Sequence, residues 1–297
     1  MDREALGNNI AVIGTCSHDH ILHIDEFPSE DHKYMCELGE SHCGGVATNV
    51  AVNLALLGMP VKLISWVGPD PSGRTIRDYL ERQGVLTDGL VTVAENTPQV
   101  FILACRKTGT RTAFMTKHRR PVSLTNLQRE QVDNCPITYY DGSRLEVSES
   151  ILKLCKSVGA SLFANYELAS AQAFRALLSS HFAVASEQAL CQGKAMTWKQ
   201  LKSKLVGIWQ PNHRLIGVTL GKRGSLFFDG HDFFRTPAIN VTEVDTTGAG
   251  DAFQAGLILG MLRGWDLLAS IRFASSPRSA KVYLCWAQLV QRRQSKY

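Results

Sequence analysis

The sequence lacks a long hydrophobic run. No stretch approaches the roughly 18 to 20 apolar residues that a helix needs to cross a bilayer, and Met1 to Asn9 is too polar for the apolar part of a secretory signal. We therefore expect a cytoplasmic protein with no membrane partner. With 297 residues, 44% of them hydrophobic, the chain is long enough to bury a large core.

A strong excess of one charge is also absent. The formal net charge is +5, and the only dense basic cluster away from the C-terminal tail is KHRR at residues 117–120. This cluster is too short to indicate a nucleic-acid surface and would suit a small anionic ligand at least as well. We expect no nucleic-acid partner.

Paired cysteine spacing is missing as well. None of the eight cysteines belongs to a C-x-x-C pair, so the thiols are predicted to be reduced, mostly buried and free of a disulfide framework. They are Cys16, Cys36, Cys43, Cys105, Cys135, Cys155, Cys191 and Cys285. His18, His20 and His23 surround Asp19, but the segment resembles a strand and offers no fourth ligand, so we predict no metal site there.

Two common phosphate-binding motifs are missing. The sequence contains no G-x-x-x-x-G-K-[ST] motif, and the first predicted strand is followed by the single Gly14 where a dinucleotide fold would have G-x-G-x-x-G. These absences exclude a P-loop enzyme and a typical nicotinamide-dependent enzyme.

An alternation of apolar strands and helices is present instead. Strands are predicted at residues 10–14, 61–68, 161–165 and 181–186, helices at 46–58, 73–85, 148–160 and 171–180, and a strand, glycine turn and strand at 215–230. This order predicts an α/β fold with a doubly wound, mostly parallel sheet flanked by helices.

Two stretches break the alternation. Residues 20–43 and about 90–118 have short alternating runs without a helix between them, which predicts antiparallel strands of a small second sheet. The sequence shows no internal repeat and no low-complexity segment. Residues 1–297 are therefore predicted to form one large domain with a small β appendage.

The run VDTTGAGDAF at residues 244–253 carries the clearest chemistry. Thr246 or Thr247 can cap a helix, and the glycines let several N–H groups point outward at its positive end, which makes an anion site. Asp251 follows, ahead of an apolar helix that must be buried. A fixed carboxylate beside an anion site suits phosphoryl transfer to an alcohol. The alternative is that Asp251 is only a favourable first-turn acid.

The same run resembles the C-terminal signature of the ribokinase-type, or PfkB, carbohydrate kinases. GGVATNVAVNLALLG at residues 44–58, followed by VGPDPSGRTIRDYLERQGV, resembles the N-terminal signature of this family, and VTLGKRGSLFFDG at 218–230 resembles its nucleotide-side strand and turn. The motifs occur in the family's order from about residue 9 to residue 275. The resemblance implies a ribokinase-like fold with a small β-sheet lid, and ATP with Mg²⁺ as cofactors.

The resemblance also implies roles for individual residues. Asp251 would be the general base, beside an anion hole formed by Gly248, Ala249 and Gly250. The acceptor would be bound by Asp19, Gly44, Gly45 and Asn49. The nucleotide would lie against Thr219, Gly221 and Gly224. Structural roles remain open for several of these, since Asp19 can cap or form a salt bridge, Asn49 can sit in a helix turn, and the glycine turn can be an ordinary hairpin.

In this family the small sheet closes over the sugar and limits ATP hydrolysis by excluding water, and in several members it pairs with its twin to form a dimer. Lys33, Arg106 and Arg111 lie on or near it, where they could meet an anionic substrate group or serve as solvated surface charges.

The sequence departs from the family pattern at two places. The N-x-x-E motif that many members carry is replaced by AVASEQAL at residues 183–190, with Ser186 and Glu187, which loosely resembles the branch of ketohexokinases and sulfo-sugar kinases, as does Tyr139–Ser143. After Ser276 the usual alanine-rich helix and glycine-containing segment are replaced by a different sequence that begins with Pro277, which puts the adenine pocket in question.

The sequence thus favours an ATP-dependent kinase that phosphorylates a primary hydroxyl of a sugar or sugar derivative. A non-catalytic sugar-binding or regulatory protein with an impaired ATP site is a second hypothesis. A nucleoside kinase of the same family is a third, for which Phe101 and Phe114 could supply an aromatic pocket near the lid.

Overall fold

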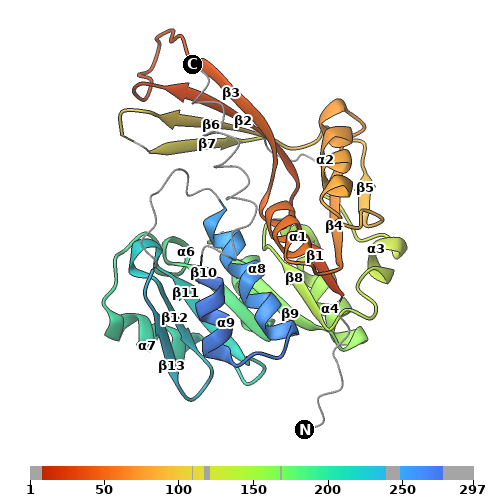
Figure 1. Ribbon diagram of the computed structural model, residues 1–297, viewed down its shortest axis with the longest axis vertical. Helices are drawn as coiled ribbons and strands as arrows, with labels where there is room; N and C mark the ends of the chain where they lie inside the picture. Colours follow the sequence, from red (N-terminus) through yellow and green to blue (C-terminus); the bar gives the residue numbers. More distant parts are fainter. Residues whose placement is uncertain (1–8, 109, 117–120, 168, 239–247, 277–297) are drawn as a thin grey trace.

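The centre of the molecule is a nine-stranded sheet (Figure 1). The computed structural model describes residues 9–108, 110–116, 121–167, 169–238 and 248–276. From one edge to the other the strands are β13 (Phe233–Thr236), β12 (Ser225–Phe228), β11 (Leu215–Thr219), β10 (Phe182–Ser186), β9 (Ser161–Tyr166), β8 (Ile137–Tyr140), β1 (Ile10–Ile13), β4 (Val61–Val67) and β5 (Leu90–Thr92). The seven strands from β11 across to β5 are parallel to one another, and only the β11–β12 and β12–β13 pairs are antiparallel.

Helices cover both faces of this sheet. One face packs against α1 (Val46–Leu56), α2 (Pro71–Arg82), α8 (Ala249–Leu262) and α9 (Leu267–Ala274). The other packs against α4 (Ser148–Val158), α5 (Ala171–Ser179), α6 (Glu187–Cys191) and α7 (Trp198–Ile208). Because both faces are covered, β1 and β8 are buried at every position, which explains the unbroken apolar sequence of β1. The doubly wound α/β fold predicted from the sequence is confirmed.

Four of the described helices, α3 (Asn126–Glu130), α6, α7 and α9, were not predicted from the sequence. Both α3 and α7 begin at a capping box, Thr125 with Gln128 in the first case and Thr197 with Gln200 in the second. A threonine followed three residues later by glutamine is a recognisable start signal, so α7 could have been located from sequence.

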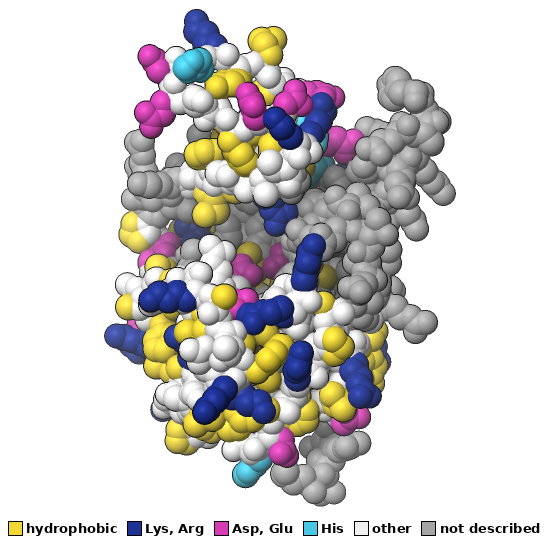
Figure 2. Space-filling view, turned by 90° about the vertical axis from the view of Figure 1, so that its left-hand side faces the viewer, with side chains coloured by type: hydrophobic (Ala, Val, Ile, Leu, Met, Phe, Trp, Pro, Cys, Tyr) yellow, Lys and Arg dark blue, Asp and Glu magenta, His cyan; other side chains and the backbone are white. Residues whose placement is uncertain are grey.

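A separate four-stranded sheet stands above the carboxyl edge of the large sheet (Figure 1). Its order is β3 (Glu37–Gly44), β2 (Ser17–Ile24), β6 (Gln99–Cys105) and β7 (Arg111–Met115). We call it the lid. In the space-filling view, acidic side chains lie in the hollow between the lid and the body (Figure 2). The predicted second sheet is therefore confirmed.

Two details of the predicted lid are wrong. Residues 90–92 do not belong to it, because β5 extends the edge of the large sheet beside β4. The central strands β2 and β6 are parallel, and only the two outer pairs are antiparallel. The parallel pairing follows from the order of the strands along the chain. Strand β2 follows β1 and strand β6 follows β5, and β1 and β5 belong to the parallel part of the large sheet. Both β2 and β6 therefore start at its carboxyl edge and run away from it in the same direction.

Several sequence expectations lie outside the described residues, namely those on residues 117–120, Thr246, Thr247, Cys285 and the segment from Pro277. The seven described cysteines are free thiols, and five of them are buried, as predicted. In the described segments, no helix is both long and apolar enough to cross a membrane.

Candidate active site

The first turns of α1 and α8 meet at the carboxyl edge of the large sheet. Asn49 Nδ2 in α1 donates a hydrogen bond of 2.8 Å to Asp251 Oδ2 in α8, which joins residues 202 positions apart. Helix α1 begins after Gly45, whose φ of 97° suits glycine. A Cβ on Gly45 would lie 2.2 Å from the Thr15 carbonyl oxygen, so only glycine permits this approach. The fold thus brings together two residues that the sequence had assigned to one site.

Asp251 is a buried acid. Only 5% of its surface is exposed, and burial, together with repulsion from Glu167 and Asp141, raises its pKa to about 7 despite the hydrogen bond from Asn49. A carboxyl group with a pKa near neutrality can both accept and release a proton under physiological conditions.

The first turn of α8 is open to a ligand. Gly248 occupies the N-cap position with a φ of 72° and has no side chain that could accept a hydrogen bond. Gly248, Ala249 and Gly250 are at least partly exposed, whereas the helix beyond them is almost entirely buried. Exposed amides at the positive end of a 14-residue helix fixed in the core form a site for an anion.

Asp19 and Gly44 lie against each other where the lid joins the body. Ser17 Oγ donates a hydrogen bond of 2.6 Å to Asp19 Oδ1, and burial raises the pKa of Asp19. A Cβ on Gly44 would lie 2.0 Å from Asp19 Oδ2, so the carboxylate occupies the space that any side chain at position 44 would need. Gly44 packs against Asp19, and Gly45 directly precedes α1, which carries Asn49. The short segment from Gly44 to Asn49 therefore links Asp19 to the Asn49–Asp251 pair.

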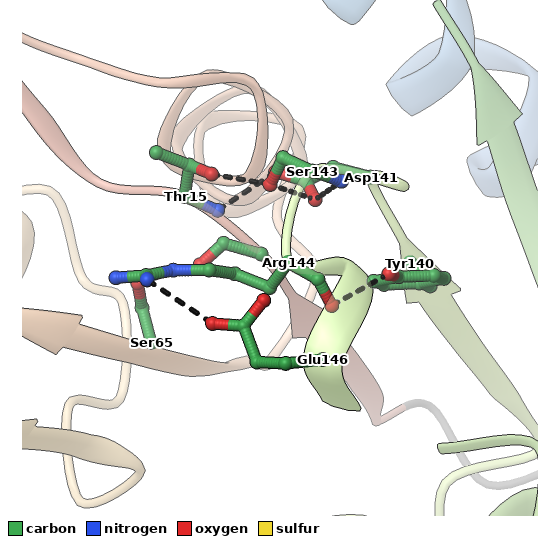
Figure 3. A network of polar contacts seen from close by, with 8 residues as sticks. Thr15, Ser65, Tyr140, Asp141, Ser143, Arg144 and Glu146 are labelled. Atoms are coloured by element: carbon green, nitrogen blue, oxygen red, sulfur yellow. Dashed lines mark hydrogen bonds and ion pairs between the residues drawn. The ribbon is translucent and has the colours of Figure 1, made fainter. Parts of the chain in front are cut away.

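Asp141, which was not among the predicted site residues, lies at the end of the central strand β8 (Figure 3). Its carboxylate accepts hydrogen bonds from Thr15 N at 2.7 Å, Ser143 N at 2.9 Å and Ser143 Oγ at 2.6 Å. Burial nevertheless raises its pKa. The backbone of Gly14 is packed against it, since a Cβ there would lie 2.0 Å from Asp141 Cγ.

Arg144 lies below this network (Figure 3) and is the nearby cation. It is 4% exposed, its Nη1 lies 3.4 Å from Glu146 Oε1, and its guanidinium is 5.6 Å from the centre of the Trp66 ring. The Arg144 charge lowers the pKa of Asp141, but the effect is smaller than that of burial.

Glu167 is the second acid that sequence reasoning missed. It follows β9, the neighbour of β8, and its charge raises the pKa of Asp251. The signal that could have found Asp141 and Glu167 is their position, because polar residues just beyond the carboxyl ends of adjacent central strands meet at one edge of a parallel sheet.

The predicted nucleotide turn lies further along the same edge. Thr219 ends β11 and donates a hydrogen bond of 3.4 Å from Oγ1 to the Ala185 carbonyl oxygen. Gly221 and Gly224 have φ values of 55° and 90°, and a Cβ on Gly224 would lie 1.9 Å from the Thr236 carbonyl oxygen. The hairpin itself therefore requires these glycines. Among the described residues, no hydrogen bond joins this turn to Asp251 or Asp19.

Ser186 and Glu187 have structural partners. Ser186 caps α6 by accepting a hydrogen bond from Ala189 N, and Glu187 forms an ion pair with Arg223. On the lid, Arg106 pairs with Glu37, and both side chains are more than half exposed. Arg106 lies beyond the outer end of β6, and this position agrees with a solvated surface charge.

The aromatic residues proposed for a nucleoside pocket lie on the lid face opposite Asp19. Phe101 pairs in register with His20 and with Phe114, and the His20 and Phe101 rings stack with centroids 5.1 Å apart. Because side chains alternate along β2, Asp19 and His20 point to opposite faces. Phe101 and Phe114 therefore do not form a pocket beside Asp19.

The chain is similar to known kinases in sequence and in fold. The chain is 27% identical over 285 residues to the ribokinase of Bacillus subtilis, covering 93% of each protein. It is 27% identical over 298 residues to a nucleoside kinase of Methanothermobacter thermautotrophicus, covering 91% of this chain and 88% of the relative. The structure of Arabidopsis thaliana ribokinase complexed with ribose and ATP has the same fold, with a TM-score of 0.81, 22% identity and coverage of 91% of both chains.

Residues 8–280 match the pfkB family of carbohydrate kinases. This match covers nearly the whole chain and includes all three motifs that carry the resemblance. The protein therefore belongs to the pfkB carbohydrate kinase family, whose members are phosphotransferases that act on an alcohol group.

Proposed function

We propose that the protein transfers the γ-phosphate of ATP to a primary hydroxyl of a sugar or sugar derivative. The observation that carries this proposal is the buried Asp251, held by Asn49 beside the open first turn of α8. A non-catalytic sugar-binding protein would not need an acid with a pKa near 7 at a helix N-terminus. This arrangement supports an enzyme.

Asp251 is the proposed general base. Its carboxylate accepts the proton of the acceptor hydroxyl as that oxygen attacks the γ-phosphorus, and the amides of Gly248, Ala249 and Gly250 donate hydrogen bonds to the transferred phosphoryl oxygens. Asn49 keeps the Asp251 carboxylate oriented during this step.

The acceptor is proposed to bind at the base of the lid. Asp19 and Asn49 can pair with its hydroxyls, while Gly44 and Gly45 let it approach the backbone. The burial that raises the pKa of Asp19 supports this proposal, because a hydrogen bond between a poorly hydrated carboxyl group and a hydroxyl is stronger than one in water.

ATP is proposed to lie along the carboxyl edge, with Thr219, Gly221 and Gly224 against its ribose and phosphates. Mg²⁺ would neutralise phosphate charge, held by phosphate oxygens rather than by a protein cage.

We also propose that residues 1–297 form one kinase domain in the cytoplasm, where ATP is supplied, with a lid that closes over the acceptor and excludes water. Leu38 and Phe114 of the lid are 70% and 57% exposed. They lie on the lid face opposite Asp19, because Leu38 pairs with Leu22 and Phe114 with Phe101. A homodimer would bury this face.

A nucleoside kinase is the second candidate, favoured by the 27% identity to the nucleoside kinase of Methanothermobacter thermautotrophicus. The position of Phe101 and Phe114 on the lid face opposite Asp19 weakens it. The two candidates differ in the acceptor and share the proposed base.

The test is ADP formation across ketoses, aldoses, sugar acids, sulfo-sugars and nucleosides. We expect turnover with one of these classes, and a loss of at least about a thousandfold in Asp251→Asn with acceptor binding retained. Asp78→Asn, an exposed acid on α2, is the matched control and should keep full activity. Undiminished turnover in Asp251→Asn would refute the assignment of the base.

A further inference from the structure

A cavity with a volume of about 560 Å³ opens between α5, α6 and α7. This volume falls within the range of small-molecule sites, about 300 to 1,000 Å³. The three helices pack on one face of the large sheet, whereas α8, which carries Asp251, packs on the other. None of the described residues proposed for catalysis, the acceptor or the nucleotide lines the cavity. It is therefore separate from the candidate active site.

The walls of the cavity are apolar and aromatic. The rings of Tyr166 and Phe174 have centroids 5.7 Å apart and are inclined at 59° to each other, and Leu190 and Ile208 line the cavity with them. Gly207 of α7 also lines it, and a Cβ there would meet no atom within 4 Å, so the space beside this helix is open. A flat or branched apolar group would bury its surface between these side chains.

Tyr166 brings a hydroxyl group without a partner. The residue is 7% exposed and lines the cavity, but among the described residues its hydroxyl makes no hydrogen bond, and burial alone raises its pKa. The buried Tyr139 and Tyr140, by contrast, donate hydrogen bonds to the Gln254 side chain and to the Arg144 carbonyl oxygen. Because a buried hydroxyl without a partner is costly, the Tyr166 hydroxyl calls for an acceptor atom inside the cavity.

Positive potential reaches the same cavity from two sources. Lys204 of α7 lines it, is partly buried, and forms no ion pair with a described residue. The nine-residue helix α5 begins there, since Ser170, its N-cap, and Ala171 both line the cavity. The first-turn amides and the dipole of a helix favour a negative charge. No acid is present among the described lining residues, so the cavity suits an anion.

We propose that this cavity binds a small molecule with an aromatic or branched apolar body and one anionic group, a carboxylate or a phosphate. The apolar body lies against Phe174, Leu190 and Ile208. The anionic group accepts hydrogen bonds from Lys204 and from the Tyr166 hydroxyl at the start of α5. A neutral molecule of the same shape would leave the Lys204 charge uncompensated, so charge sets the specificity. The inference is independent of the proposed function.

The experiment is isothermal titration calorimetry of the full-length protein with 3-phenylpropionate, phenyl phosphate and the neutral 3-phenylpropionamide. We expect at least one of the two anions to bind at least about tenfold more tightly than the amide, and the tighter anion identifies the carboxylate or the phosphate as the natural group. Lys204→Gln should abolish this preference, whereas Lys199→Gln, an exposed lysine on the same helix, should keep it. Tyr166→Phe should weaken anion binding about threefold or more.

Gly207→Phe locates the bound molecule. The new ring enters the open space beside α7, so binding of both anions should be lost, and cooperative thermal unfolding verifies that each variant folds. A wild type that binds no probe, or that binds the amide as tightly as the anions, would overturn the inference. So would an anion affinity that is unchanged in Lys204→Gln or in a folded Gly207→Phe. ADP formation by the wild type tests the proposed function separately.

Discussion

Replacing the proposed base is expected to stabilise the protein at alkaline pH while it abolishes activity. The pKa of Asp251 is about 7 in the folded protein against an ordinary value of 3.8. The unfolded chain therefore loses this proton at a lower pH than the native state. Stability is unaffected by Asp251 below 3.8, falls as the pH rises from 3.8 to 7, and is lowest above 7.

The size of the effect follows from the same values. The full difference between the folded and unfolded pKa corresponds to at most about 4 kcal/mol of lost stability at pH 8. In Asp251→Asn the amide oxygen of the new side chain can still accept the hydrogen bond from Asn49, so the substitution removes the charge and keeps the contact. We expect the variant to be about 2 to 4 kcal/mol more stable than the wild type at pH 8.

The assay is urea unfolding of the wild type, Asp251→Asn and the control Asp78→Asn at several pH values. Between about pH 5.5 and pH 8 the stability advantage of Asp251→Asn should grow by roughly 2 kcal/mol, because up to about pH 7 the unfolded chain has lost this proton while native Asp251 still holds it. An advantage that does not change with pH, or a variant less stable than the wild type at pH 8, would refute the assignment of a buried acid with a raised pKa.

Three further substitutions test other parts of the site. Asn49→Ala removes the hydrogen bond that lowers the pKa of the base, so the acid limb of kcat/KM should move to higher pH by about one unit; an unmoved limb contradicts this. Gly44→Ala places a methyl group 2.0 Å from Asp19 Oδ2 and should raise the acceptor KM about tenfold or more, whereas Gly207→Ala has nothing within 4 Å and should have no effect. Phe114→Asp should convert a dimer to a monomer in sedimentation velocity, and a monomeric wild type would rule out the lid dimer.

The candidate site residues that could be named from the sequence lie in short segments. Gly44 and Gly45 admit backbone contacts that no larger residue allows, and Gly248 opens a helix whose apolar sequence requires burial. These are properties of a few consecutive residues, so motif and periodicity reveal them. The order of strands and helices followed from the same alternation of apolar segments.

The acids around Asp251 were not predictable in this way. Asp141 and Glu167 belong to no motif, and they join the site only because β8 and β9 are neighbours in the middle of the sheet. Glu187 forms an ion pair with Arg223, which comes from another turn of the chain, and this pairing is not visible in either local sequence.

By itself, the sequence determined the α/β fold and the lid, and it singled out Asp19, Asn49 and Asp251 as candidates, because each depends on local periodicity or on a recognisable motif. Tertiary structure alone decided the parallel pairing within the lid, the placement of Phe101 opposite Asp19, and the environment that raises the pKa of Asp251. The physical reason is that burial and charge repulsion depend on distances between segments far apart in the chain, and strand order sets those distances.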